Sequence, residues 1–353
     1  MCSSDLYLEG GQTNARALDG GGHDIVKGED GYLIIRRIVT NVNNFVVRDG
    51  VVRLDYDNRV NLLMRPDITN VVLGVAGGAI DTGAGNPLQT TVNYKEGDVQ
   101  DRTQLPMFEI FGANNTNSAV QMTNTFNLVM NRGVFRAYSR QLATATQQNG
   151  GYQPGLFTGS VTLNGNAADN WIWVEAQDNG TLTGSIKRTV FSGPITGAGG
   201  FTKLGYGEMT LTGTNDFTGR LNINRGHYAG PGGFYAGIAL REGGQLTGVP
   251  EIVLDRNGDL YLDNRSVNMG DRVNDAAWIE SRSWNAIKID GNASAATSET
   301  LGRVTNRSGY LTFRLDRAAT PQPMTLNLAG LTRLPGRDRK STRLNSSQVS
   351  QYR

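Results

Sequence analysis

Residues 197–226 read Gly197-Ala-Gly-Gly-Phe-Thr-Lys-Leu-Gly-Tyr-Gly-Glu-Met-Thr-Leu-Thr-Gly-Thr-Asn-Asp-Phe-Thr-Gly-Arg-Leu-Asn-Ile-Asn-Arg-Gly226, and this stretch decides the fold. Met209 and Leu211 alternate with Thr210 and Thr212, which is the period of a strand with one buried face. Residues that tolerate positive φ interrupt the alternation at Gly205, Gly207, Gly213, Asn215, Asp216 and Gly219. The stretch therefore predicts several short strands joined by tight turns, without a helical stripe.

The same residues follow a pattern that runs Gly-x-Gly-Gly-Leu-Thr-Lys-x-Gly-x-Gly-Thr-Leu-x-Leu-x-Gly-x-Asn-x-Tyr-x-Gly and ends in Asn-x-Gly. The matching positions are Gly199, Gly200, Thr202, Lys203, Gly205, Gly207, Leu211, Gly213, Asn215, Gly219, Asn224 and Gly226. Phe201, Met209 and Phe217 replace Leu, Leu and Tyr, whereas Glu208 and the segment 227–228 depart from the pattern. In these features the stretch resembles the autotransporter-associated β-strand repeat of bacterial surface proteins.

The resemblance implies a right-handed parallel β-helix within the passenger part of a secreted protein. It places the chain outside the cell or on the outer-membrane surface of a bacterium, in a structural or adhesive role. It implies no chemistry, and the expected partners are a surface polysaccharide or the surface of a host or neighbouring cell. We expect stacked parallel strands over about residues 23–330, with Leu211, Phe217, Leu221 and Ile223 in a continuous core.

A second, degenerate copy of the repeat is predicted at residues 23–56. Lys27 aligns with Lys203, and Leu33 aligns with Met209. A chance match of a few Lys and Gly positions is the alternative.

Both ends of the chain resemble translated sequencing adapter, residues 1–6 on one strand and residues 338–353 on the other. We expect these segments to pack against nothing and residues 7–337 to be the natural fragment. Without the two ends the chain loses its only cysteine, Cys2. The full sequence has 34 basic and 32 acidic residues, and the shortened chain has equal numbers of each. A neutral chain without a basic patch argues against nucleic-acid binding.

The rest of the chain shows short apolar or alternating runs at intervals of about 10 residues, which is typical of an all-β solenoid or sandwich. The 46 glycines do not follow the Gly-x-y period of collagen. The sequence contains no run of 18 apolar residues, so it predicts no membrane-spanning helix. Residues 139–158 and 264–283 are predicted to be protruding loops, and a short helix is possible in the second. Strand-to-strand similarity and the glycine spacing favour the solenoid.

The candidate ligand contacts are Trp171 and Trp173 in Trp171-Ile-Trp-Val-Glu175. Their i, i+2 spacing puts both rings on one face of a strand, where they form either a platform for a sugar or a packed cluster under a loop.

No residues are proposed as catalytic, cofactor-binding or metal-binding. His23 and His227 lack metal-ligand spacing. The segment 255–263 supplies oxygens as a calcium loop does, but Leu260 stands where such a loop needs glycine, so a turn is predicted.

Two functional hypotheses remain. One is a non-catalytic structural or adhesive section of a surface protein, and the other is a β-helical carbohydrate-active enzyme, a polysaccharide lyase or glycosidase, or a phage-spike-like module. A cleft lined by neighbouring Asp or Glu and Arg on one solenoid face favours the second hypothesis, and mostly neutral faces favour the first.

Overall fold

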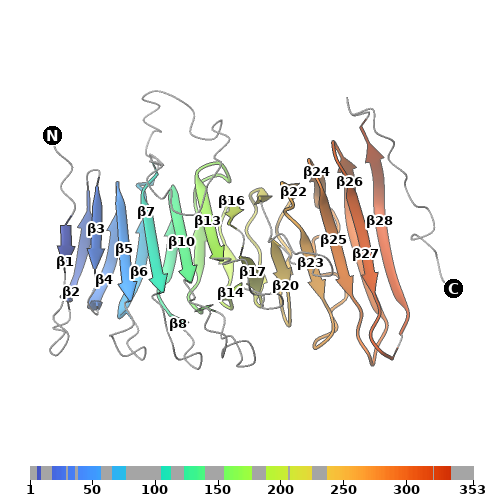
Figure 1. Ribbon diagram of the computed structural model, residues 1–353, viewed down its shortest axis with the longest axis horizontal. Coiled ribbons are helices and arrows are strands. Elements are labelled where there is room, and N and C mark those ends of the chain that lie inside the picture. Colours follow the sequence, from blue (N-terminus) through green and yellow to red (C-terminus); the bar gives the residue numbers. More distant parts are fainter. Residues whose placement is uncertain are drawn as a thin grey trace, which may run out of the picture.

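The computed structural model describes residues 6–8, 18–28, 31–35, 39–56, 66–76, 105–112, 123–139, 155–176, 188–205, 207–224, 237–320 and 322–334. Every element in these ranges is a β-strand, and the strands lie side by side from β1 at one end to β28 at the other (Figure 1). The described ranges contain no helix that is long and apolar enough to cross a membrane.

Three parallel sheets run along the molecule. Sheet 1 has 12 strands: β1 (Leu6–Leu8), β3 (Tyr32–Ile35), β5 (Val51–Tyr56), β7 (Met107–Gly112), β10 (Gly133–Ser139), β13 (Asn170–Ala176), β16 (Phe201–Leu204), β19 (Leu221–Asn224), β22 (Glu251–Asp255), β24 (Trp278–Ser281), β26 (Thr297–Asn306) and β28 (Met324–Arg333). Sheet 2 has 8 strands: β8 (Thr123–Asn124), β11 (Gly155–Phe157), β14 (Arg188–Phe191), β17 (Glu208–Leu211), β20 (Ile238–Leu240), β23 (Leu260–Asp263), β25 (Asn285–Asp290) and β27 (Leu311–Asp316). Sheet 3 has 6 strands: β2 (Leu18–Lys27), β4 (Val39–Val47), β6 (Ile68–Leu73), β9 (Asn127–Met130), β12 (Val161–Leu163) and β15 (Ile195–Thr196). A two-stranded pair, β18 (Thr214–Asn215) and β21 (Gln245–Leu246), follows β15 along the chain.

Successive strands of the chain belong to different sheets, so the chain winds through the sheets and returns to sheet 1 once per coil. One coil takes the chain from Phe201 to Leu221, which is its parallel partner in the next coil. Other coils are longer because they carry loops between the strands. The predicted all-β parallel solenoid is therefore confirmed.

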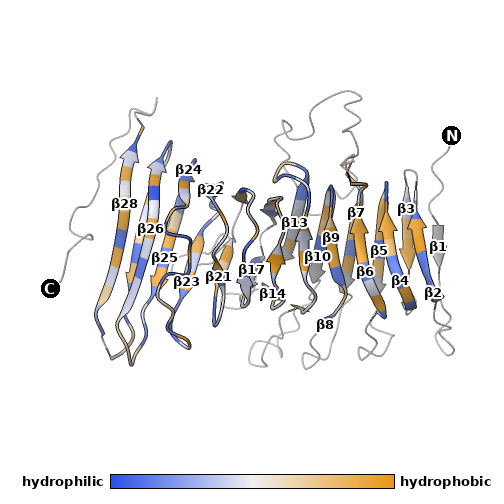
Figure 2. Cartoon of the chain, turned by 180° about the vertical axis from the view of Figure 1, so that it is seen from behind, coloured by the Kyte–Doolittle hydropathy of each residue, from blue (hydrophilic) through white to orange (hydrophobic). Residues whose placement is uncertain are grey.

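A continuous apolar core runs through the coils. Leu211, Phe217, Leu221 and Ile223 are fully buried, as predicted. From Phe45 to Phe191 the core contains a series of phenylalanines in edge-to-face or tilted contact. Their ring centroids lie 5.2–5.7 Å apart in the pairs Phe45–Phe108, Phe108–Phe126, Phe126–Phe157 and Phe157–Phe191. Figure 2 shows apolar and polar positions alternating along the strands, as a one-sided core requires.

Buried polar side chains explain why the repeat pattern matched by residues 197–226 has lysine and asparagine at fixed positions. Asn215 is fully buried; it donates to the carbonyl oxygens of Gly213 and Gln245, both at 2.8 Å, and accepts from the amide of Ile195. Lys203, also fully buried, donates from Nζ to the carbonyl oxygen of Gly205 at 2.7 Å. These bonds satisfy turn backbone inside a stack of coils, where water does not reach it.

Three expectations meet different outcomes. The short helix considered within residues 264–283 is wrong: turns and bends precede β24 there. In the degenerate copy, Lys27 lies in sheet 3 and its aligned Lys203 lies in sheet 1, so the two lysines do not occupy equivalent positions. The repeat at 23–56 itself stays a prediction. At the ends, Leu6 pairs with Leu33, contrary to expectation for that residue, while residues 1–5 and 338–353 lie outside the described ranges.

Close contact between coils makes one glycine a test of the stacking. A Cβ built on Gly219 lies 2.3 Å from the carbonyl carbon of Gly199 in the neighbouring coil, whereas one on Gly270 meets only the Ser298 hydroxyl at 3.5 Å. We expect Gly219→Ala to lower the free energy of unfolding by about 1–3 kcal/mol and Gly270→Ala to leave it nearly unchanged. Urea denaturation followed by circular dichroism measures both, and equal effects would contradict this stacking.

Candidate functional site

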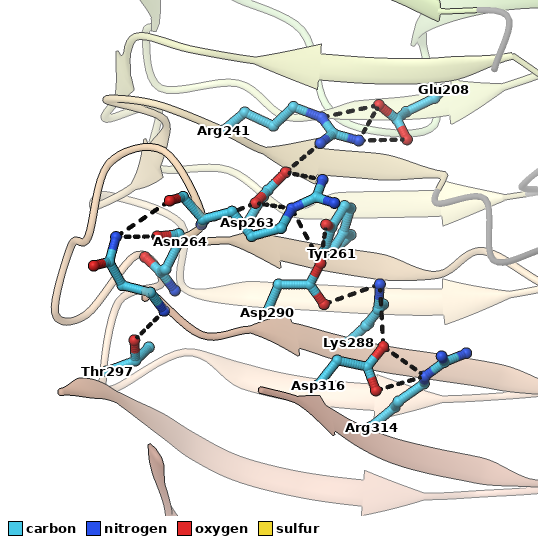
Figure 3. Close-up of polar contacts among 12 residues, drawn as sticks. Glu208, Arg241, Tyr261, Asp263, Asn264, Lys288, Asp290, Thr297, Arg314 and Asp316 are labelled. Carbon is cyan, nitrogen blue, oxygen red and sulfur yellow. Dashed lines mark hydrogen bonds and ion pairs between the residues drawn. The ribbon is translucent and has the colours of Figure 1, made fainter. Parts of the chain in front are cut away.

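The densest set of interacting charges lies on the outer face of sheet 2. We call it the charged ladder: Glu208, Arg241, Asp263, Arg265, Lys288, Asp290, Arg314 and Asp316 (Figure 3). These residues come from β17, β23, β25 and β27 and from positions directly after β20 and β23. The ladder thus joins five successive coils.

Strand alternation and register place the ladder. In β23 the side chains of Leu260 and Leu262 are buried in the core, so Tyr261 and Asp263 point outward. The register pairs Tyr261 with Lys288 and Lys288 with Arg314, one column along the solenoid. It also pairs Asp263 with Asp290 and Asp290 with Asp316, the next column.

The aspartate column is stabilised by basic residues that bridge adjacent coils. Parallel stacking puts its three carboxylates at successive strand spacings of about 4.8 Å, where like charges repel. Lys288 Nζ lies 2.9 Å from Asp290 Oδ1 and 3.4 Å from Asp316 Oδ2. Arg265 lies 2.7 Å from Asp263 and 3.3 Å from Asp290. Each bridge replaces a repulsion by two attractions.

Arg241 extends the ladder to Glu208, one of the two departures from the repeat pattern. Its guanidinium lies 3.1 Å from Glu208 Oε1 and also pairs with Asp263. Glu208 is 1% exposed and accepts a second hydrogen bond, from the Thr210 hydroxyl at 2.8 Å. The departure from the repeat is thus the first residue of the ladder.

Tyr261 lies among the cations of the ladder. The Arg241 guanidinium lies 4.8 Å and the Lys288 ammonium 4.6 Å from the ring centroid, both within cation–π range. The phenol donates to Asp290 Oδ2. Burial raises the pKa of Tyr261, and the hydrogen bond to Asp290 raises it further, so the group stays a neutral donor.

Two carboxylates of the ladder, those of Asp263 and Asp316, are held ionised. Burial by itself raises the pKa of Asp263, but hydrogen bonds from Arg265 and the charge of Arg241 outweigh it and lower that pKa to about 2. The pKa of Asp316 is also lowered, since hydrogen bonds from Arg314 and the charge of Lys288 outweigh its burial. Neither group holds a proton to donate near neutral pH.

Two carboxyl groups outside the ladder differ from it in electrostatics. Burial raises the pKa of Asp259 to about 7, although its Oδ1 accepts a hydrogen bond from the amide of Ala286. Burial also raises the pKa of Glu299 to about 7, although the amides of Arg272 and Val273 donate to its two oxygens. Asp259 precedes β23 and is partly exposed, whereas Glu299 is fully buried.

The predicted loop 264–283 is wrong for its last part, because the strand β24 lies within it, and Arg272 organises the part between β23 and β24. It is fully buried and donates to Asn264 Oδ1 and to the carbonyl oxygens of Gly244, Asp263 and Val267, at 2.8–2.9 Å. One guanidinium thereby satisfies three acceptors at residues 263–267 and a fourth, Gly244, in the turn before β21, which shapes the loop without a helix.

The two tryptophans that the sequence singled out lie on the outer face of sheet 1. Trp171 and Trp173 point to the same face, as their spacing predicts, and are 5% and 6% exposed. They pack with Leu105, Met107 and Val134, and the Arg136 guanidinium lies 4.2 Å from a Trp173 ring centroid. Arg136 also pairs with the buried Glu109 at 3.0 Å. Both rings are therefore nearly covered, and sugar contact at them stays a prediction.

Other sequence-level candidates have structural roles or fall outside the described ranges. Residues 255–259 form the predicted turn, with positive φ at Arg256 and Asn257 and a hydrogen bond from Gly258 N to Asp255 O at 2.8 Å. Among the described residues, no group of three or more His, Cys, Asp or Glu could hold a metal ion. His23 lies in β2, whereas His227 and residues 140–154 of the predicted loop 139–158 are not described.

Sequence reasoning missed the ladder, although the sequence contains a signal for it. Three strands end in the same motif, Tyr261-Leu-Asp263, Lys288-Ile-Asp290 and Arg314-Leu-Asp316. In each motif an apolar residue separates two outward polar ones. Recognising the motif as a ladder requires the register between coils.

Comparisons with known proteins found no match. No protein-family model matches it, and no curated protein or solved structure is significantly similar to it.

Removing the Arg241 guanidinium tests whether the ladder is an interdependent unit. We expect Arg241→Ala to lower the free energy of unfolding by about 3–5 kcal/mol because it leaves the buried Glu208 without its cation. The matched control is Arg220→Ala, which breaks an exposed pair with Glu251 and costs less than about 1 kcal/mol. Adding Glu208→Gln to Arg241→Ala restores part of the loss, and equal costs for the two arginines would contradict the interpretation.

Glu299 predicts the direction of a pH effect on stability. Between its usual pKa near 4.5 and its folded value of about 7, the folded chain keeps a proton that the unfolded chain has released. Stability therefore falls as the pH rises through this window. We expect the free energy of unfolding of Glu299→Gln to depend less on pH than that of the wild type. Its change between pH 4.5 and 7 should be smaller by about 2 kcal/mol, whatever the absolute stability of the variant. Urea denaturation at several pH values measures this, and parallel curves for mutant and wild type would refute it.

Proposed function

We propose that the chain is a non-catalytic, structural and adhesive section of a secreted, autotransporter-like bacterial surface protein. The observation that carries the proposal is the neutralisation of the charged ladder, in which each carboxylate has a basic partner within the same set. A face built this way stabilises stacked coils and presents fixed polar groups outward. Such a face is better suited to binding a partner than to transferring a proton.

The lowered pKa of Asp263 supports this choice. Hydrolysis of a glycosidic bond requires a carboxylic acid whose pKa lies near the working pH, together with a second carboxylate. The pKa of Asp263 is lowered to about 2, so at neutral pH this group is ionised and has no proton to give.

The resemblance of residues 197–226 to the autotransporter-associated repeat supports the proposed location on the bacterial surface. A solenoid suits such a role because each added coil extends the molecule without enlarging a single core. In this proposal the loops that leave the coils serve as contact elements, among them the Arg272-ordered loop before β24.

A second candidate function is a β-helical carbohydrate-active enzyme, or a phage-spike-like module with such activity. The sequence analysis expects such an enzyme to have a cleft lined by neighbouring Asp or Glu and Arg on one solenoid face. The ladder provides the neighbouring Asp and Arg residues of that feature. Asp259 adds a specific reason: its pKa of about 7 is suitable for a general acid, and it directly precedes β23, a strand of the same sheet. In the adhesive account this carboxyl group instead binds the Ala286 amide.

Screening the full chain against a panel of soluble polysaccharides, for both binding and cleavage, separates the two candidates. We expect binding without release of reducing ends or unsaturated products, and Asp259→Asn should leave binding unchanged. Trp171→Ala and Trp173→Ala test the predicted sugar contact on sheet 1. Reproducible cleavage that Asp259→Asn abolishes would replace the adhesive proposal with the enzymatic one.

A further inference from the structure

Two aromatic side chains at the start of β25 and β27 are exposed to solvent side by side. Trp284 is 67% exposed and Tyr310 is 44% exposed, and their ring centroids lie 5.4 Å apart at an interplanar angle of 75°. The register pairs Asn285 with Leu311, so the two aromatic residues occupy equivalent positions in successive coils. A large aromatic pair left in water is unusual on a surface that has no use for it.

The aromatic pair begins a strip of outward positions along β25 and β27. Alternation puts Ala286 and Lys288 on the same face as Trp284, and Thr312 and Arg314 on the same face as Tyr310. Along the strands the strip therefore has an aromatic pair, then a pair of short side chains, then a cationic pair. We call these six residues the aromatic–cationic strip.

The length of the strip suits an extended ligand. Lys288 lies four positions after Trp284, which corresponds to about 13 Å along a strand. The short side chains of Ala286 and Thr312 leave the positions between the two ends unobstructed by bulk. An oligosaccharide segment lying along the strands would contact rings at one end and nitrogen donors at the other.

The charge of the strip determines which class of saccharide fits. Lys288 and Arg314 are paired with Asp290 and Asp316 at 2.9 Å, so this part of the face carries no net charge. A neutral set of fixed donors and acceptors matches sugar hydroxyls and gives no electrostatic attraction to a polyanion. The exposed rings match the apolar C–H face of a pyranose.

We propose that the aromatic–cationic strip binds a neutral polysaccharide, with sugar rings stacked on Trp284 and Tyr310 and hydroxyl groups on Lys288 and Arg314. This inference rests on the proposed adhesive function and assigns its contact to sheet 2. It is separate from the buried tryptophans of sheet 1.

Affinity electrophoresis of the full chain tests the strip, with laminarin, hydroxyethyl cellulose and galactomannan as neutral probes and polygalacturonate as the acidic probe. We expect at least one neutral probe to retard the chain, and Trp284→Ala and Tyr310→Ala each to weaken that retardation about tenfold or more. Tyr310→Phe should retain binding because it keeps the ring. The matched control is Leu331→Ala, which removes an equally exposed apolar side chain on β28, 51% exposed, and should change nothing.

The outcomes distinguish the strip from the proposed function. Retardation by a neutral probe that both alanine variants abolish, and that salt leaves unchanged, supports the strip. Binding that survives both alanine variants overturns the strip and leaves the adhesive function standing. Retardation by polygalacturonate alone, weakened by salt, or no retardation by any probe, overturns the neutral-saccharide assignment. Cleavage of a bound probe overturns the non-catalytic function while the strip stands.

Discussion

The whole structure depends on one constraint, the parallel stacking of each coil on the one before it at the spacing of hydrogen-bonded strands, about 4.8 Å. Every side chain then lies directly above and below its equivalents in neighbouring coils. Inside, the constraint places Phe157 against its register partner Phe191 in the next coil, with ring centroids 5.2 Å apart. Outside, it forces carboxylates such as Asp263, Asp290 and Asp316 into one column, which is stable only because basic residues bridge it.

The same constraint explains which features the sequence predicted. The fold class and the buried residues Leu211, Phe217, Leu221 and Ile223 follow from local alternation and glycine spacing, which any one coil contains. The ladder does not follow from local sequence, because Glu208 meets Arg241 across 33 residues of chain. The helix considered within 264–283 was wrong for a related reason: local composition allowed a helix, but the distant contacts of Arg272 with Gly244 decide that loop.

Sheet 2 therefore combines two surface chemistries along its strands near the β28 end of the molecule. Toward the carboxyl ends of β23, β25 and β27 the charges neutralise one another and hold successive coils together. Directly before β25 and β27, Trp284 and Tyr310 are exposed to solvent and do not belong to the core. The charges at one end of these strands hold the coils together. The exposed rings at the other end can therefore bind a partner without weakening the stacking of the coils.

Cross-linking between coils tests the stacking register most directly. The register pairs Ala286 with Thr312, and neighbouring parallel strands bring such Cα atoms within the range that a disulfide bridges. With Cys2 replaced by serine, the double variant Ala286→Cys, Thr312→Cys should oxidise readily to an intramolecular disulfide. The variant Ala286→Cys, Asp316→Cys, displaced by four residues along the strand, should not. Efficient cross-linking of the displaced pair, or none for the paired positions, would contradict the stacking on which the core, the ladder and the strip all depend.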